Sequence, residues 1–139
     1  MSCVNQRSLV ERITSCGGVE LVMASSLRQG DWLNDALHPT SCGMQVAGVL
    51  VSRSKGGLHQ FCTWMGLNAL GSQWIMRQDG TWSRLRDMTP VTGNQSLDAV
   101  VTIITNDAQV IRVDNVLCRT LSCEDWRVVR CKAHEMRVP

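Results

Sequence analysis

The architecture of this chain is predicted most clearly by one segment, Ala99-Val-Val-Thr-Ile-Ile-Thr-Asn-Asp-Ala-Gln-Val-Ile-Arg-Val-Asp-Asn-Val-Leu-Cys-Arg-Thr-Leu121. Residues 99–105 are apolar or β-branched on both alternating faces, as expected of a strand that is covered on both sides. Residues 110–113 alternate instead, so that Ile111 and Val113 face inward and Arg112 faces solvent. Asp114-Asn115 suits a tight two-residue turn. The segment therefore predicts a closed or doubly packed β fold rather than a single solvated sheet.

The same pattern extends outward over most of the chain. From Val19 onward, short apolar and β-branched runs alternate with Gly, Asn and Asp, which is typical of an all-β domain. We expect strands at Val19–Ala24, Gln45–Ser52, Leu58–Met65, Gln73–Arg77, Thr81–Leu85, Ala99–Thr105, Gln109–Val113, Val116–Leu121 and Trp126–Lys132. Lys55-Gly56-Gly57 and Asp79-Gly80 are further hairpin turns, because glycine readily adopts positive φ.

The N-terminal segment predicts a short helix over Asn5–Ser15. Ser8 and Glu11 have the spacing of a capping box, and the neighbouring apolar residues fall on one helical face. A chain of 139 residues fits one domain with a single core. We therefore expect a mainly β, barrel-like or sandwich domain of hairpins with a short N-terminal helix. It spans 1–139, with a helix or arm at 1–18, a β core at 19–132 and a C-terminal tail at 133–139.

Composition narrows the classes of function. The formal net charge is +2, from 14 basic and 12 acidic residues, which does not favour nucleic-acid or membrane-surface binding through bulk charge. The chain has no apolar run of signal-peptide or membrane-span length, so we expect an intracellular, reducing environment when it is made, and possible incorporation into a virion. The seven cysteines are then reduced and behave as small buried residues. The five tryptophans are expected to be anchors in the core or at its edge, with each indole N–H bonded to a carbonyl, and ligand stacking is the alternative.

Candidate chemical groups give only one metal hypothesis. Cys118, Cys123, Cys131 and His134 are residue types that bind zinc, although structural zinc sites usually contain two close ligand pairs. Buried structural thiols explain the same cysteines. No phosphate-binding glycine motif occurs, and His59 and Cys62 fall on opposite faces of a strand. We therefore predict no catalytic, cofactor-binding or metal residue, and keep a zinc-stabilised binding domain as an alternative.

Two short segments suggest an internal pseudo-repeat. Ser25-Ser-Leu-Arg-Gln-Gly-Asp-Trp-Leu33 and Gly80-Thr-Trp-Ser-Arg-Leu-Arg-Asp-Met88 each present Leu-Arg, then Asp, then a large apolar residue. The first segment, with Val22-Met-Ala24 before it and Val46-x-x-Val49-Leu-Val-Ser-Arg-Ser after it, resembles the first half of a Hint domain, the β fold of inteins and hedgehog autoprocessing modules. The second segment, with Trp74-Ile-Met before it, resembles the second half.

The Hint resemblance implies two pseudo-symmetric halves and a nucleophile near the domain start, where Cys16 lies. The family's middle block, Thr-x-x-His, reads Leu70-Gly-Ser-Gln-Trp74 here, and His134 has no following Asn. Without a group that protonates the scissile amide, an acyl shift loses a factor of about 10² to 10⁴ in rate. The resemblance therefore implies an inactive scaffold, with self-processing through Cys16 as the alternative.

A second resemblance covers the middle third of the chain. Val49-Leu-Val-Ser-Arg-Ser-x-Gly-Gly-Leu-His-Gln60, followed by Trp74-Ile-Met-Arg77-x-Asp79-Gly-Thr-Trp82-Ser, is similar to receptor-facing knob modules of phage tail fibres. Both resemblances describe small β modules. We expect a non-enzymatic structural or interaction module, a component of a bacteriophage or other virus particle, that binds protein partners or itself through exposed strand edges and terminal segments.

Overall fold

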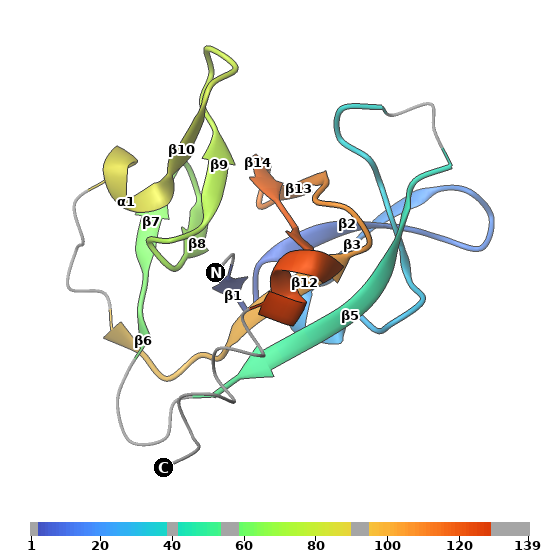
Figure 1. Cartoon of the computed structure of the whole chain (residues 1–139), viewed down its shortest axis with the longest axis horizontal. Coiled ribbons are helices and arrows are strands. Elements are labelled where there is room, and N and C mark those ends of the chain that lie inside the picture. The colour runs from blue at the N-terminus through green and yellow to red at the C-terminus, as the bar shows by residue number, and fades with distance from the viewer. Residues whose placement is uncertain (1–2, 39–41, 54–58, 90–94, 129–139) are drawn as a thin grey trace.

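The computed structural model describes residues 3–38, 42–53, 59–89 and 95–128, and it is a single small domain that is mainly β (Figure 1). One large sheet has the strand order β10-β9-β14-β13-β2-β4-β5-β12-β1-β8-β7, with β3 paired to β2 and β15 paired to β12. Its strands are β1 Val4–Asn5, β2 Leu9–Ile13, β3 Val19–Met23, β4 Trp32–Leu33, β5 Met44–Ser52, β7 Cys62–Trp64, β8 Leu67–Ala69, β9 Trp74–Met76, β10 Trp82–Arg84, β12 Val100–Thr105, β13 Val110–Val113, β14 Val116–Arg119 and β15 Leu121–Ser122. The strands β6 His59–Gln60 and β11 Gln95–Ser96 form a separate pair.

The longest pairing joins β5 and β12 at the centre of the sheet. Its antiparallel register runs from Val100 opposite Ser52 to Thr105 opposite Val46, with a β-bulge beside Ile104. Every residue of β12 is buried. The prediction that this segment is a strand covered on both faces is therefore confirmed.

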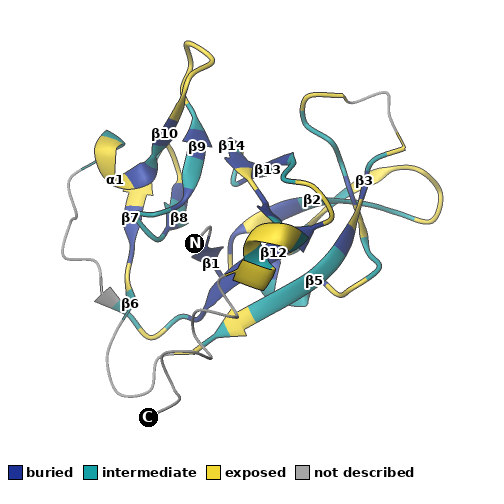
Figure 2. Cartoon of the chain, in the orientation of Figure 1, coloured by how far each residue is buried: buried dark blue, intermediate teal, exposed yellow. Residues whose placement is uncertain are grey.

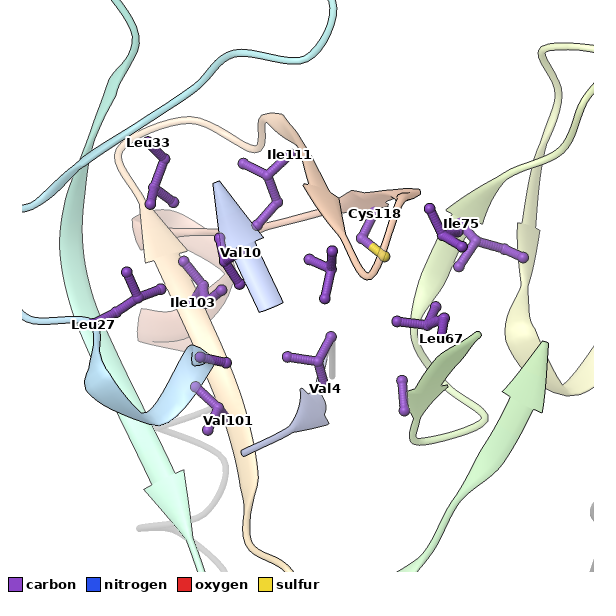
Figure 3. Close-up of a cluster of buried hydrophobic side chains, with 14 of the residues drawn as sticks. Val4, Val10, Leu27, Leu33, Leu67, Ile75, Val101, Ile103, Ile111 and Cys118 are labelled. Atoms are coloured by element: carbon purple, nitrogen blue, oxygen red, sulfur yellow. The ribbon is translucent and has the colours of Figure 1, made fainter. Parts of the chain in front are cut away.

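Two clusters of apolar side chains cover the two faces of β12. Val101 and Ile103 point into the main core, and Figure 3 shows them among side chains from both ends of the chain. Val100 packs on the other side with Cys3 and Phe61. Since side chains alternate along a strand, these two sets follow directly from the pleat of β12.

The sheet curls so that its ends approach one another. The helix α1, Leu85–Met88, follows β10 at one end of the strand order and contacts β7 at the other. Arg86 donates its main-chain N–H to the Gly71 carbonyl at 3.0 Å. A Cβ atom on Gly71 would lie 2.9 Å from the Arg86 Cβ, so this close approach requires glycine. The domain is therefore barrel-like.

Hairpin turns follow the expected chemistry at three places. Gly17 in the β2–β3 turn and Gly80 in the β9–β10 turn have positive φ, and each donates to a carbonyl three residues earlier at 3.0 Å. This geometry is the three-residue hairpin loop that ends in a left-handed residue. Asp114 and Asn115 both have positive φ in the β13–β14 turn, as a two-residue hairpin loop needs. The predicted turns at Asp79-Gly80 and Asp114-Asn115 are confirmed.

The predicted N-terminal helix is wrong. Residues 5–15 contain the end of β1 and the whole of β2, and β2 pairs with β3, β4 and β13. Val10 is buried while Leu9 is exposed, which is the alternation of a strand. The apolar spacing of Leu-Val-Glu-Arg-Ile fits the period of a helix as well as that of a strand. The segment is a strand because it pairs with three neighbouring strands. Residues 3–18 are thus not a separate arm, because β1 and β2 belong to the core.

Two other expected elements differ from the structure. The strand expected at Leu58–Met65 is two strands, β6 paired with β11 and β7 paired with β8. Among the described strands, neither β6 nor β7 forms a hairpin with β5, because β5 pairs with β4 and β12. Residues 55–57, where the hairpin turn was expected, lie outside the described residues. Residues 126–128 of the expected strand Trp126–Lys132 are helical, within a helical segment that begins at 123. Residues 129–132 and the predicted tail at 133–139 also lie outside the described residues.

The repeated Leu-Arg motif places one leucine at each end of the core. Leu27 follows the short 3-10 helix Ala24–Ser26, and Leu85 begins α1; both side chains are at most 1% exposed and belong to the main core cluster. Each leucine follows a strand hairpin that turns at a glycine. In both copies a hairpin is therefore followed by a helical turn with a buried leucine, which ends the turn in the first copy and begins it in the second.

We predict that Leu27→Ala and Leu85→Ala each destabilise the protein by about 2–5 kcal/mol, because each leaves a cavity in the core. Urea unfolding followed by tryptophan fluorescence measures the loss. Leu97→Ala is the matched control, since Leu97 is 79% exposed, and its change should stay within about 0.5 kcal/mol. A loss at only one of the two core leucines would contradict their equivalence.

Candidate functional site

The two aspartates of the repeated motif have different environments. Asp31 closes a turn with Arg28: its carboxylate accepts the Arg28 N–H at 2.8 Å, and its own N–H donates to the Arg28 carbonyl at 3.1 Å. Asp87 lies in α1 instead. Asp31 therefore organises the backbone, as Asp commonly does in turns.

The expectation that the tryptophans lie in the core or at its edge holds for Trp64, which packs against the main core, but not for Trp32 and Trp82, which are exposed. Trp32 is 45% exposed and Trp82 is 37% exposed, and the other three are half-buried. The guanidinium of Arg84 stacks on the Trp74 ring, 4.3 Å from its centroid, and donates to the Ser72 carbonyl at 2.7 Å. Arg84 is thus held by contacts with residues of its own sheet and the loop before it.

The cysteines divide into exposed and buried thiols. Cys16 and Cys42 are exposed, and Cys16 lies in the β2–β3 turn, which is largely exposed (Figure 2). Cys3, Cys62 and Cys118 are buried. The structure therefore places the sequence candidate Cys16 on a projecting turn and not on a core strand.

The described part of the expected zinc set does not gather at one point of the surface. Cys118 is a core residue of β14, opposite Ile75 of β9. Cys123 is half-buried, and its thiol lies 3.7 Å from the Asn106 side-chain oxygen. Cys131 and His134 lie outside the described residues. Over the described ranges, no group of three His, Cys, Asp or Glu side chains has the arrangement of a metal site.

Cys3 is buried, as expected of the cysteines, and it has a polar partner that the sequence did not indicate. Its Sγ lies 3.1 Å from the Thr102 hydroxyl, across the pairing of β1 with β12. Its carbonyl accepts the Leu70 N–H at 3.1 Å. Burial raises the pKa of the Cys3 thiol, and the hydrogen bond to Thr102 only partly offsets this. A protonated thiol in an apolar setting is a poor nucleophile. Interpreting residues 9–13 as a strand would have placed Cys3 at the edge of the core.

The described histidines bond to groups close to them in the fold. His59 Nδ1 lies 3.0 Å from the Asp98 carbonyl oxygen, and its ring meets Phe61 edge-on. His38 Nδ1 lies 3.3 Å from an Asp35 carboxylate oxygen on an exposed turn. These contacts fix the loops beside β6 and β4.

The most distinctive exposed feature is the outer side of β3, which we name the β3 edge surface and define by Val19, Leu21 and Met23. Their side chains are 52%, 62% and 48% exposed, while Glu20 and Val22 between them are half-buried. Among the described strands, β3 pairs with β2 alone. An apolar strand with one open edge is a template for pairing with another chain.

A pocket of about 350 Å³ lies next to the β3 edge surface, over β2 and the β13–β14 turn. Leu9 and Leu21 form its apolar side, and Glu11 and Arg112 form its charged side. One carboxylate oxygen of Glu11 is buried without a hydrogen-bond partner in the described structure. The apolar surface of β3 therefore extends to Leu9 of β2, and the rest of the pocket is lined by the polar residues Glu11, Arg112, Asp114 and Asn115.

Comparison with known proteins leaves the function to be inferred from this geometry. No protein-family model and no curated protein sequence matches the chain. In the described part of the chain, no helix is both long and apolar enough to cross a membrane. The candidate functional site is therefore the β3 edge surface, which has exposed apolar side chains on an open strand edge.

We predict that alkaline pH destabilises the fold through Cys118. Burial raises the pKa of this thiol above its ordinary value of 9.0. Above pH 9 the unfolded chain loses the proton and the folded chain keeps it, so stability falls as pH rises, by up to about 1.4 kcal/mol per pH unit. Urea unfolding between pH 7.5 and 10.5 measures the slope.

The control for this prediction is Cys118→Val, which removes the titrating group and keeps an apolar side chain of similar size. Its stability should fall less steeply above pH 9 than that of the parent protein. Equal slopes for the two proteins would show that the Cys118 thiol does not stay protonated in the folded state.

Proposed function

We propose that this chain is a non-enzymatic structural or interaction module, a component of a bacteriophage or other virus particle, that acts by binding protein. The observation that carries the proposal is the β3 edge surface. It combines exposed apolar side chains with a strand edge that pairs with no other described strand. Proteins that remain monomeric usually protect such edges with charges, proline or a bulge.

The open edge explains what kind of ligand suits the module. An extended strand of another polypeptide can hydrogen-bond to the main chain of β3, and its alternate side chains can then contact Val19, Leu21 and Met23. These three residues supply no charge or hydrogen-bonding side chain. The surface therefore suits protein better than a nucleotide, a sugar or a nucleic acid, which need polar side chains for recognition.

The placement of the thiols supports a non-enzymatic role. The buried thiol of Cys3, just before β1, packs with Phe61, Val100 and Leu70, and Thr102 is its polar neighbour. The position that the Hint resemblance assigns to a histidine is occupied by residues without an acid–base group. The resemblance to tail-fibre knob modules supports the particle assignment, because such modules work by contact alone.

A test of the non-enzymatic assignment is the intact mass of the purified protein after prolonged incubation. We expect the full 15.4 kDa chain, with no product that begins at Cys16. Cys16→Ala should give the same result. A product that begins at Cys16, absent in the Cys16→Ala variant, would support the alternative of a Hint-type self-processing domain.

A test of the interaction assignment is the state of the purified chain, alone and mixed with the products of the genes that flank its own. We expect association with itself or with one of these chains, measured by light scattering and by pull-down. A monomer at all concentrations that binds none of the neighbouring products would contradict the proposal.

A further inference from the structure

We propose that the partner of the β3 edge surface is a second copy of this chain, paired antiparallel through β3 about a twofold axis at Leu21. This inference rests on the proposed function, and it specifies the partner and the register. Three features of β3 support this pairing: the direction in which its free main-chain groups point, the order of its side chains and the positions of its charges.

The hydrogen-bonding direction follows from the β2–β3 ladder. Leu9 exchanges hydrogen bonds with Asp114 at 2.9 Å, and the Glu11 carbonyl accepts from Asn34, so both residues direct their main chain away from β3. Their partners in the register are Met23 and Leu21. In an antiparallel ladder, both residues of such a pair point their N–H and C=O groups outward.

The main-chain groups on the open side are therefore those of Val19, Leu21 and Met23. The same three residues expose their side chains. The Met23 carbonyl accepts the Ser26 hydroxyl at 2.7 Å and retains a second lone pair. An added strand would find alternate donors and acceptors along the whole length of β3.

A second copy of β3 fits this edge when Leu21 lies opposite Leu21. Val19 then lies opposite Met23 of the other copy, and every outward-facing residue meets another outward-facing residue. Glu20 lies opposite Val22, so no charge faces a like charge. Glu20 is already bonded to Arg12 of its own chain, at 2.8 Å to Nε and 2.6 Å to Nη2.

The neighbouring registers are worse. Placing Val19 opposite Leu21 puts Glu20 directly opposite Glu20, and like charges in that position are destabilising. Centring the pair on Val22 leaves Val19 without a partner. A shift by one residue sets outward-facing groups against inward-facing ones, which removes the hydrogen bonds. The register centred on Leu21 uses all five residues of β3, Val19–Met23.

The pairing also closes. In a twofold interface both copies use the same surface. The open edge of each β3 is therefore paired with the other copy, and neither edge stays open. The six side chains of Val19, Leu21 and Met23 from the two copies then form one apolar band, with Leu9 of each copy beside Met23. The product is a dimer and not a filament.

The first test is Leu21→Glu in the full chain, measured by sedimentation equilibrium from about 10 µM to 1 mM. The parent protein is expected to dimerise, and the variant to dimerise at least about tenfold more weakly, since two carboxylates would then face each other on the axis. Leu97→Glu is the matched control, because Leu97 is 79% exposed and lies outside β3. Far-ultraviolet circular dichroism and urea unfolding establish that each variant folds.

The second test checks the register with two double variants of equal polarity. Val19→Glu with Met23→Lys places opposite charges face to face in the proposed pairing, whereas Val19→Glu with Met23→Glu places like charges there. We expect the first to dimerise at least about tenfold more strongly than the second at low salt, and the difference to shrink at high salt. Equal affinities would overturn the register.

The outcomes separate this inference from the proposed function. Self-association that survives Leu21→Glu, or oligomers larger than a dimer, would overturn pairing through β3 and leave an interaction module. A monomeric parent chain that binds a flanking gene product would overturn the second copy as partner. A monomeric parent chain that binds none of those products would overturn both proposals.

Discussion

The pairing of β5 with β12 is the constraint on which the rest of the structure depends. β12 has a buried side chain at every position, so the chain must supply cover for both of its faces. One face receives the main core, to which both halves of the chain contribute, and the other receives the smaller cluster around Cys3 and Phe61. The sheet therefore curls around its own centre, and the surface strands β3 and β10 are left at the periphery.

The parts of the fold that the sequence predicts are those whose local pattern has one interpretation. Residues 99–105 are apolar on both faces, and Asp114-Asn115 and Asp79-Gly80 are strong turn pairs, so these elements appear where expected. The segment from Leu9 to Ile13 fits a helix and a strand equally well. It is a strand because it pairs with three other strands, at residues 19–23, 32–33 and 110–113. No local pattern in the sequence identifies these strands as its neighbours.

The candidate surface was harder to predict than the core. Exposed strand edges were expected as contact sites, but which edge stays open depends on the complete strand order. Val19, Leu21 and Met23 have the composition of buried strand residues, and only the structure shows that they are exposed and that, among the described strands, β3 pairs with β2 alone. The partner of Cys3 was not predicted for a related reason, because Thr102 lies 99 residues away in the sequence.

The position of β1 has a consequence for how this protein is made in the cell. Val4 pairs with Ala69 and with Val101, and β1 lies between β8 and β12 in the middle of Figure 1. β1 therefore leaves the ribosome well before residues near 101, and it must wait for them before its pairing with β12 can form. At roughly 5–20 residues per second, this delay lasts on the order of 5 to 20 seconds. During that interval the apolar early strands need shielding, so slow translation or loss of chaperone capacity should reduce the yield of this chain more than that of proteins with local contacts.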